Sequence, residues 1–140
     1  MSNRRVRAFA ILVTGVLLLG GCTSMKSKDR ALLLNDALFQ YASAMRWGHI
    51  NTANSYLRAP DGTPLAGNET FREDIRVTGY KVLSQAPVDE HHIQVEARLE
   101  YMSEQTGRIN VVEESQSWWY DPDARRWFMD GHLPEVVLAR

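Results

Sequence analysis

Cysteine is almost absent from this chain of 140 residues, because Cys22 is the only one. A single cysteine excludes an intramolecular disulfide. The four histidines form neither an HExxH sequence nor a pair four residues apart, and no second cysteine accompanies them, so no metal site is expected. Phosphate-binding and nucleophile-elbow motifs are also missing, and no cofactor or catalytic residue is expected. The four histidines of the chain are His49, His91, His92 and His132.

Blocks of basic residues are missing from the body of the chain. Residues 22–140 contain 13 Lys and Arg against 17 Asp and Glu, a net charge of −4 with histidine neutral. A mildly acidic domain without a basic patch does not favour nucleic acid as a partner. The 119 residues of this part are enough for one domain with a core of its own.

Apolar runs long enough to cross a membrane are lacking too, since a spanning helix needs about 20 apolar residues. Residues 8–19 form an apolar run of 12, interrupted by Thr14 and Gly15 and preceded by three arginines among residues 4–7. Basic, apolar and small residues in this order are typical of a secretory signal peptide. The alternative is an anchor that is not removed and that carries a free thiol.

The stretch Leu19-Gly20-Gly21-Cys22 resembles the lipobox of bacterial lipoproteins. The resemblance implies that residues 1–21 are removed and that Cys22 carries acyl chains on its sulfur and its new amine. Residues 22–28 are then a lipidated, polar tether between the membrane lipid and the domain. Thr23 rather than Asp follows the cysteine, which in that family implies the outer membrane facing the periplasm. The expected location is therefore the bacterial cell envelope.

After the tether, the pattern predicts two helices. Residues 29–47 repeat apolar side chains at helical spacing, and Gly48 is suited to end the helix that Ser27 or Asp29 would cap. A shorter helix is expected over residues 49–58, followed by a turn over 60–64, a loop and one helical turn over 71–74. The predicted buried stripe of the long helix consists of Leu34, Leu38, Tyr41 and Met45.

From Ile75 onward the apolar period changes to two, which predicts strands. They are expected over residues 75–84, 92–102, 108–120 and 125–130, and residues 136–138 are expected to pack back on the domain. The strand over 92–102 has one apolar and one polar face, which favours an antiparallel sheet with one face in the core. The hairpin at residues 104–107 predicts that Leu99 pairs with Val112 and Ala97 with Glu114.

Helices followed by a curved antiparallel sheet of about four strands describe an α+β roll. The stretch from Phe39 to Leu57 and the ending Trp118-Trp119-Tyr120-Asp121-Pro122 with Trp127-Phe128-Met129-Asp130-Gly131 resemble the opening and final hairpin of the NTF2-like, or cystatin-like, superfamily. The resemblance covers residues 29–134 and implies one domain over residues 29–140.

The superfamily contains enzymes such as ketosteroid isomerase and scytalone dehydratase, and also non-catalytic modules, so the fold does not choose the function. The first hypothesis is a membrane-anchored, non-catalytic binding or assembly module that docks on an envelope partner or holds an apolar ligand. The alternative is a small pocket enzyme, which would need a carboxylate or histidine deep in the fold.

The predicted hairpin register places polar side chains on the apolar face of the sheet. Glu114 and Gln116 share this face with Trp118, and a buried carboxylate needs a partner, water or a cavity mouth. We therefore predict a small, mostly apolar pocket whose polar lining is Tyr41, Glu114 and Gln116. The alternatives are plain structural hydrogen bonding, or a slip of one residue that turns Glu114 to solvent and Glu113 inward.

A partner surface is predicted on the opposite face of the last hairpin. With residues 121–124 as its loop, Trp118 pairs with Trp127, while Trp119 and Phe128 point to the other side of the sheet. Exposed large aromatic side chains often mark an interface. The alternative is that helix or tail residues cover them.

Overall fold

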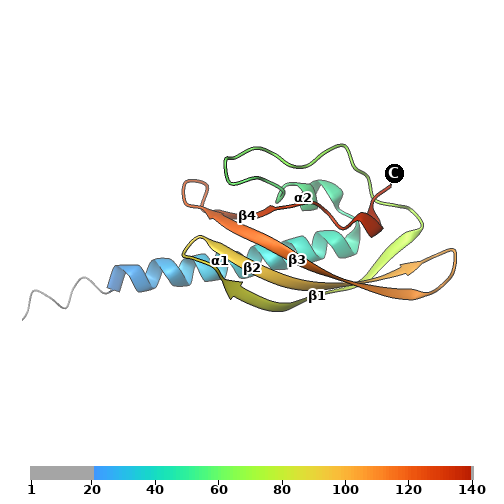
Figure 1. The fold of residues 1–140 in the computed structure, drawn as a ribbon, viewed down its shortest axis with the longest axis horizontal. Coiled ribbons are helices and arrows are strands. Elements are labelled where there is room, and N and C mark those ends of the chain that lie inside the picture. The colour runs from blue at the N-terminus through green and yellow to red at the C-terminus, as the bar shows by residue number, and fades with distance from the viewer. Residues whose placement is uncertain (1–20, 140) are drawn as a thin grey trace, which may run out of the picture. The chain divides into compact units, whose positions relative to one another are not determined.

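The structure is a computed structural model that describes residues 21–139, with side chains from residue 24 onward, so residues 1–20 of the predicted signal peptide and the side chain of Cys22 lie outside it. The described residues divide into two units, residues 21–32 and 33–139. The second unit is α+β, as predicted, with a helix packed on a four-stranded antiparallel sheet (Figure 1). The elements are α1 (Gly21–Trp47), α2 (Ile50–Asn54), β1 (Ile75–Pro87), β2 (His92–Ser103), β3 (Ile109–Asp121), β4 (Arg126–Asp130) and η1 (Glu135–Val137), and the strand order is β1-β2-β3-β4.

Helix α1 begins earlier than predicted. It starts at Gly21 rather than at Asp29, so residues 22–28, expected as a tether, are helical. Ser27 does not cap the start, because its hydroxyl donates to the carbonyl of Ser24 within the helix (2.9 Å). Residues 22–28 contain no glycine or proline that would stop a helix. The predicted end is confirmed, because Gly48 adopts the left-handed conformation (φ 71°) that follows many helices.

The core lies between α1 and one face of the sheet. The predicted stripe of α1 is buried, and Tyr41 is fully inaccessible. Burial of a side chain of this size contributes about 1.5–3 kcal/mol, so this interface accounts for much of the stability. The core comprises Leu34, Ala37, Leu38, Tyr41, Ala44 and Met45 from α1, Leu57, and Ile93, Val95, Leu99, Trp118, Tyr120, Trp127 and Met129 from the sheet.

The segment after α1 is less helical than predicted. Helix α2 ends at Asn54, and Leu57 instead forms a parallel bridge with Met129. The amide of Met129 donates to the carbonyl of Tyr56 (2.7 Å), and the amide of Arg58 donates to the carbonyl of Met129 (3.0 Å). The reason is the free edge of β4, whose backbone groups need partners.

Two further boundaries also differ from the prediction. Residues 71–74 form no helical turn, because Phe71 bridges Leu138, which confirms that the end of the chain packs back. Strand β1 runs on to Pro87, and its pairing with β2 shifts register between Val77 and Gly79 and again between Val82 and Ser84. Such bulges bend a strand and increase its twist.

The register between β2 and β3 is as predicted, with Leu99 opposite Val112. The register between β3 and β4 is not, because Trp118 pairs with Met129 rather than with Trp127. Asp121 explains the difference: its carboxylate accepts from the amides of Asp123 (2.9 Å) and Ala124 (3.1 Å), which moves the loop to residues 122–125. A shift of two residues leaves every side chain on its predicted face.

Candidate functional site

A chain of polar side chains crosses the inner face of the sheet. The side-chain amide of Gln116 lies at its centre, and this residue is 5% exposed. Its nitrogen donates to the hydroxyl of Tyr80 (2.7 Å) and lies 3.3 Å from a carboxylate oxygen of Glu114. Its oxygen accepts from the indole nitrogen of Trp118 (3.0 Å). Both ends of the Gln116 amide are thus engaged, as a buried amide requires.

Tyr41 reaches the same place from α1. Its ring stands edge-on to those of Tyr80 (5.8 Å between centroids) and Trp118 (5.7 Å). Its hydroxyl is buried and has no hydrogen-bond partner among the described residues. Burial raises the pKa of Tyr41, and the nearby Tyr80 and Glu114 raise it further. The hydroxyl is therefore neutral and remains a donor without an acceptor.

Glu114 is the acidic group of this site. Burial raises its pKa, while the hydrogen bond from Gln116 and the nearby His132 act in the opposite direction. Glu114 borders a cavity of 430 Å³ beside β3, together with Gln116, Met129 and His132. His132 is exposed, and its Nδ1 lies 2.9 Å from the carbonyl oxygen of Leu133. A buried hydrogen-bond network and an open, partly polar cavity thus meet at Glu114.

The three predicted pocket residues have different environments. Glu114 and Gln116 line the cavity and point inward, as the register predicted, so the one-residue slip does not occur. Tyr41 does not line the cavity and instead belongs to the core. The prediction missed Tyr80 and His132. Tyr80 pairs with the buried Leu99, but the bulges of β1 hide this relation from the sequence.

The prediction that Trp119 and Phe128 are exposed is wrong. They do lie on the face opposite the core and stack at 5.3 Å, but Trp119 is only 7% and Phe128 only 3% exposed. The contacts on this face include Arg58, from the segment after α2, and Arg126 of β4. The indole of Trp119 donates to the carbonyl of Arg58 (2.7 Å), and the guanidinium groups of Arg58 and Arg126 lie over the Phe128 ring at 4.5 and 5.3 Å. Exposure therefore gives no support to a partner surface there.

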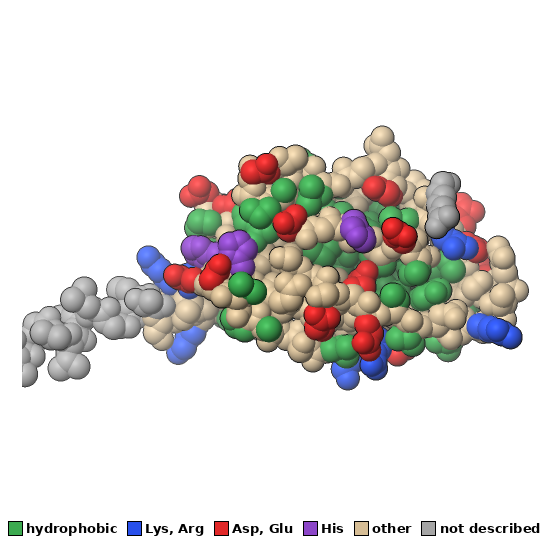
Figure 2. Space-filling view, viewed as in Figure 1, with side chains coloured by type: hydrophobic (Ala, Val, Ile, Leu, Met, Phe, Trp, Pro, Cys, Tyr) green, Lys and Arg blue, Asp and Glu red, His purple; other side chains and the backbone are tan. Residues whose placement is uncertain are grey.

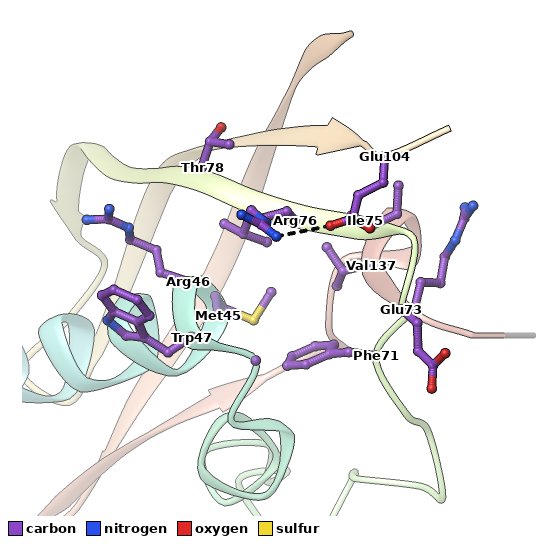
Figure 3. Close-up of a pocket in the computed structure, with 13 residues that line it drawn as sticks. Met45, Arg46, Trp47, Phe71, Glu73, Ile75, Arg76, Thr78, Glu104 and Val137 are labelled. Carbon is purple, nitrogen blue, oxygen red and sulfur yellow. Dashed lines mark hydrogen bonds and ion pairs between the residues drawn. The ribbon is translucent and has the colours of Figure 1, made fainter. Parts of the chain in front are cut away.

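A larger cavity of 590 Å³ lies at the end of α1, and the sequence did not indicate it (Figure 3). Its wall includes the apolar side chains of Met45, Phe71 and Val137. Across the cavity from these side chains, Arg76 forms an ion pair with Glu104 (3.1 Å), which the dashed line in Figure 3 marks. The exposed Arg46 and Trp47, which contact each other through a cation–π interaction (5.9 Å), stand at the opposite end of the wall. The cavity combines an apolar wall with charged groups at its rim.

Within residues 21–139, no helix is both long and apolar enough to cross a membrane. The same residues contain no group of three or more His, Cys, Asp or Glu side chains that could hold a metal ion.

Comparison with protein-family models, with curated proteins and with solved structures finds no match for this chain.

Proposed function

We propose that this protein is a lipoprotein of the bacterial cell envelope whose domain is a non-catalytic binding or assembly module. The observation that carries the proposal is the sequence Leu19-Gly20-Gly21-Cys22 directly after the basic and apolar segments of an export signal. Acyl chains on Cys22 hold the protein in the membrane. Threonine after the cysteine favours the outer membrane, with the domain facing the periplasm.

The polar groups of the site support a module rather than an enzyme. The side-chain amide of Gln116 forms hydrogen bonds with Tyr80 and Trp118. Its polar atoms are therefore occupied within the protein rather than directed at a ligand. The Tyr41 hydroxyl is buried in the core and does not line the cavity. Two cavities of 430 and 590 Å³ offer space for an apolar or amphipathic ligand. The helix-on-sheet arrangement is compatible with an NTF2-like domain, which is part of the proposal.

Mass spectrometry of the intact protein from the membrane fraction tests the anchor. The expected mass is that of residues 22–140 plus the acyl chains. An unmodified Cys22, or a retained segment 1–21, would overturn the proposal. Affinity purification of the lipidated protein from its native envelope then tests whether the domain is a binding module. A binding module should co-purify with a stoichiometric partner or a bound apolar ligand.

A pocket enzyme of the ketosteroid isomerase or dehydratase type is the second candidate. One observation favours it: Glu114 has a raised pKa and borders the same cavity as His132. A raised pKa brings a carboxyl group closer to the range in which it exchanges protons. Turnover of a ketosteroid that is abolished by Glu114→Gln would establish the enzyme. Absence of turnover by the intact protein would remove this candidate for that substrate.

A further inference from the structure

Strand β3 is longer than the strand beside it. Only residues 117–121 of β3 pair with β4, whereas residues 109–119 pair with β2. Among the strands that the structure describes, residues 109–116 therefore have a neighbour only on the β2 side. In Figure 1, this part of β3 runs on beyond the end of β4 toward the β2–β3 hairpin. It is an open edge of the sheet.

The backbone directions along this edge follow from two hydrogen bonds. The amide of Ser103 donates to the carbonyl of Arg108 (3.3 Å), and the amide of Tyr120 donates to the carbonyl of His91 (2.8 Å). Even-numbered residues of β3 thus direct their backbone groups to the β2 side. Because directions alternate along a strand, residues 109, 111, 113 and 115 direct their amides and carbonyls to the open side. Among the described residues, no other segment bonds to them there.

The open edge of β3 carries neither a proline nor a bulge, so its protection rests on charged side chains alone. Proteins protect sheet edges with bulges, prolines or charged side chains. Strand β1 has two bulges, but the β2–β3 register is continuous from one end to the other. The side chains of Ile109 and Val111 on the outer face are 65% and 55% exposed. Figure 2 shows hydrophobic side chains at the surface over the same part of the sheet.

The charges along the edge identify the partner. The segment begins with Arg108, is apolar at Val111 and Val112, and ends with Glu113 and Glu114. A strand that is basic at one end and acidic at the other complements itself when two copies run antiparallel. We propose that a second copy of this chain pairs with the open edge of β3, β3 against β3, so that two four-stranded sheets become one continuous sheet.

The register of this pairing follows from the same charges. With Val111 on the two-fold axis, Arg108 of each copy lies opposite Glu114 of the other, on the inner face of the sheet. A register centred on Glu113 would instead place two Glu113 carboxylates directly opposite each other, which is unfavourable. In the first register Gly107 of the second copy lies opposite Ser115.

Site-specific cross-linking of the full chain in isolated membranes tests the pairing. Val111→Cys treated with a short bis-maleimide should give a product of twice the chain mass on a denaturing gel. The wild-type chain controls for Cys22, and Val88→Cys controls for an exposed position in the β1–β2 turn (68% exposed, against 55% for Val111). A product no stronger than in these controls overturns the proposal. A product that contains a different protein also overturns it, because the edge then belongs to another partner.

A second experiment does not depend on cross-linking. Sedimentation of the full chain in a density-matched detergent should give the mass of a dimer, and Val111→Lys should give that of a monomer, because a lysine on an edge strand opposes pairing. Leu83→Lys, the same change on β1, should remain a dimer. Arg108→Glu should weaken association at least tenfold by placing like charges opposite each other. A wild-type monomer at all concentrations, or a Val111→Lys dimer as stable as wild type, contradicts the proposal.

Discussion

The side-chain nitrogen of Gln116 lies 2.7 Å from the hydroxyl of Tyr80, 36 residues earlier in the chain. Within the part of the chain that the structure describes, the hydroxyl of the adjacent Tyr41 has no such partner. Tyr80→Phe should therefore cost about 1 kcal/mol of unfolding free energy, whereas Tyr41→Phe should be neutral or stabilising, because it removes an unsatisfied buried group. Urea unfolding of the two variants measures the difference. A larger loss for Tyr41→Phe than for Tyr80→Phe would show that the Tyr41 hydroxyl has a partner.

Glu114 should make stability depend on pH. Because its folded-state pKa is raised, the folded protein holds the proton more tightly than the unfolded chain does. Stability should therefore fall as the pH rises from the usual glutamate range through the raised folded pKa. Glu114→Gln should abolish this fall, so that its stability relative to wild type increases with pH. Urea unfolding between pH 4 and pH 8 measures it in the Val111→Lys background, in which Arg108 of a second copy does not lie opposite Glu114, with the exposed Glu113→Gln as the matched control. Parallel pH profiles for wild type and Glu114→Gln would contradict the assignment.

The helix–sheet core should be sensitive to truncation. Leu38 of α1 is 4% exposed and Leu99 of β2 is inaccessible. Leu38→Ala and Leu99→Ala should each lower the free energy of unfolding by about 2–5 kcal/mol. The loss combines the transfer free energy of the removed atoms with the cost of the cavity that they leave. Phe39→Ala is the control on the same helix, because Phe39 is 69% exposed and should change stability little. Losses under about 1 kcal/mol at both leucines would mean that the packing between α1 and the sheet is not as described.

Trp119 and Phe128 should behave as structural residues. Truncation of either to alanine should cost about 3–5 kcal/mol, because each is buried under the segment that contains Arg58. Arg58→Ala should cost less, because the backbone carbonyl that accepts from Trp119 remains. Thermal unfolding of the three variants orders these effects. If Trp119→Ala keeps full stability but loses a co-purifying protein, the residue belongs to an interface after all.

The lipid anchor makes a prediction in cells. Cys22→Ser removes the only sulfur that the acyl chains can use, so the protein should leave the membrane fraction or fail to mature. Several acyl chains are needed for stable anchoring, because one chain holds only marginally and each buried CH₂ contributes about 0.8 kcal/mol. Cell fractionation followed by immunoblotting measures the membrane association of the wild-type and Cys22→Ser chains. Equal membrane association of the Cys22→Ser variant would exclude acylation as the anchor.

Local patterns in the sequence determined the strands and their faces. Alternation of apolar and polar side chains requires only neighbouring residues, so it placed Leu99 on the core side and Glu114 opposite Ala97. The short hairpin at residues 104–107 left little freedom in the β2–β3 register. The stripe of α1 followed in the same way from its helical spacing, although its beginning did not, because Ser27 and Asp29, the predicted caps, lie inside the helix.

Only the tertiary structure decided the contacts between distant segments. The carbonyl of Arg58 accepts from Trp119, 61 residues away, and thereby helps to cover an aromatic side chain that the local pattern left exposed. The carboxylate of Asp121 moved the β4 register by two residues, and the bulges of β1 brought Tyr80 to Gln116. These outcomes depend on which buried polar groups find partners once the chain is folded, and this competition among distant groups is not contained in any local pattern.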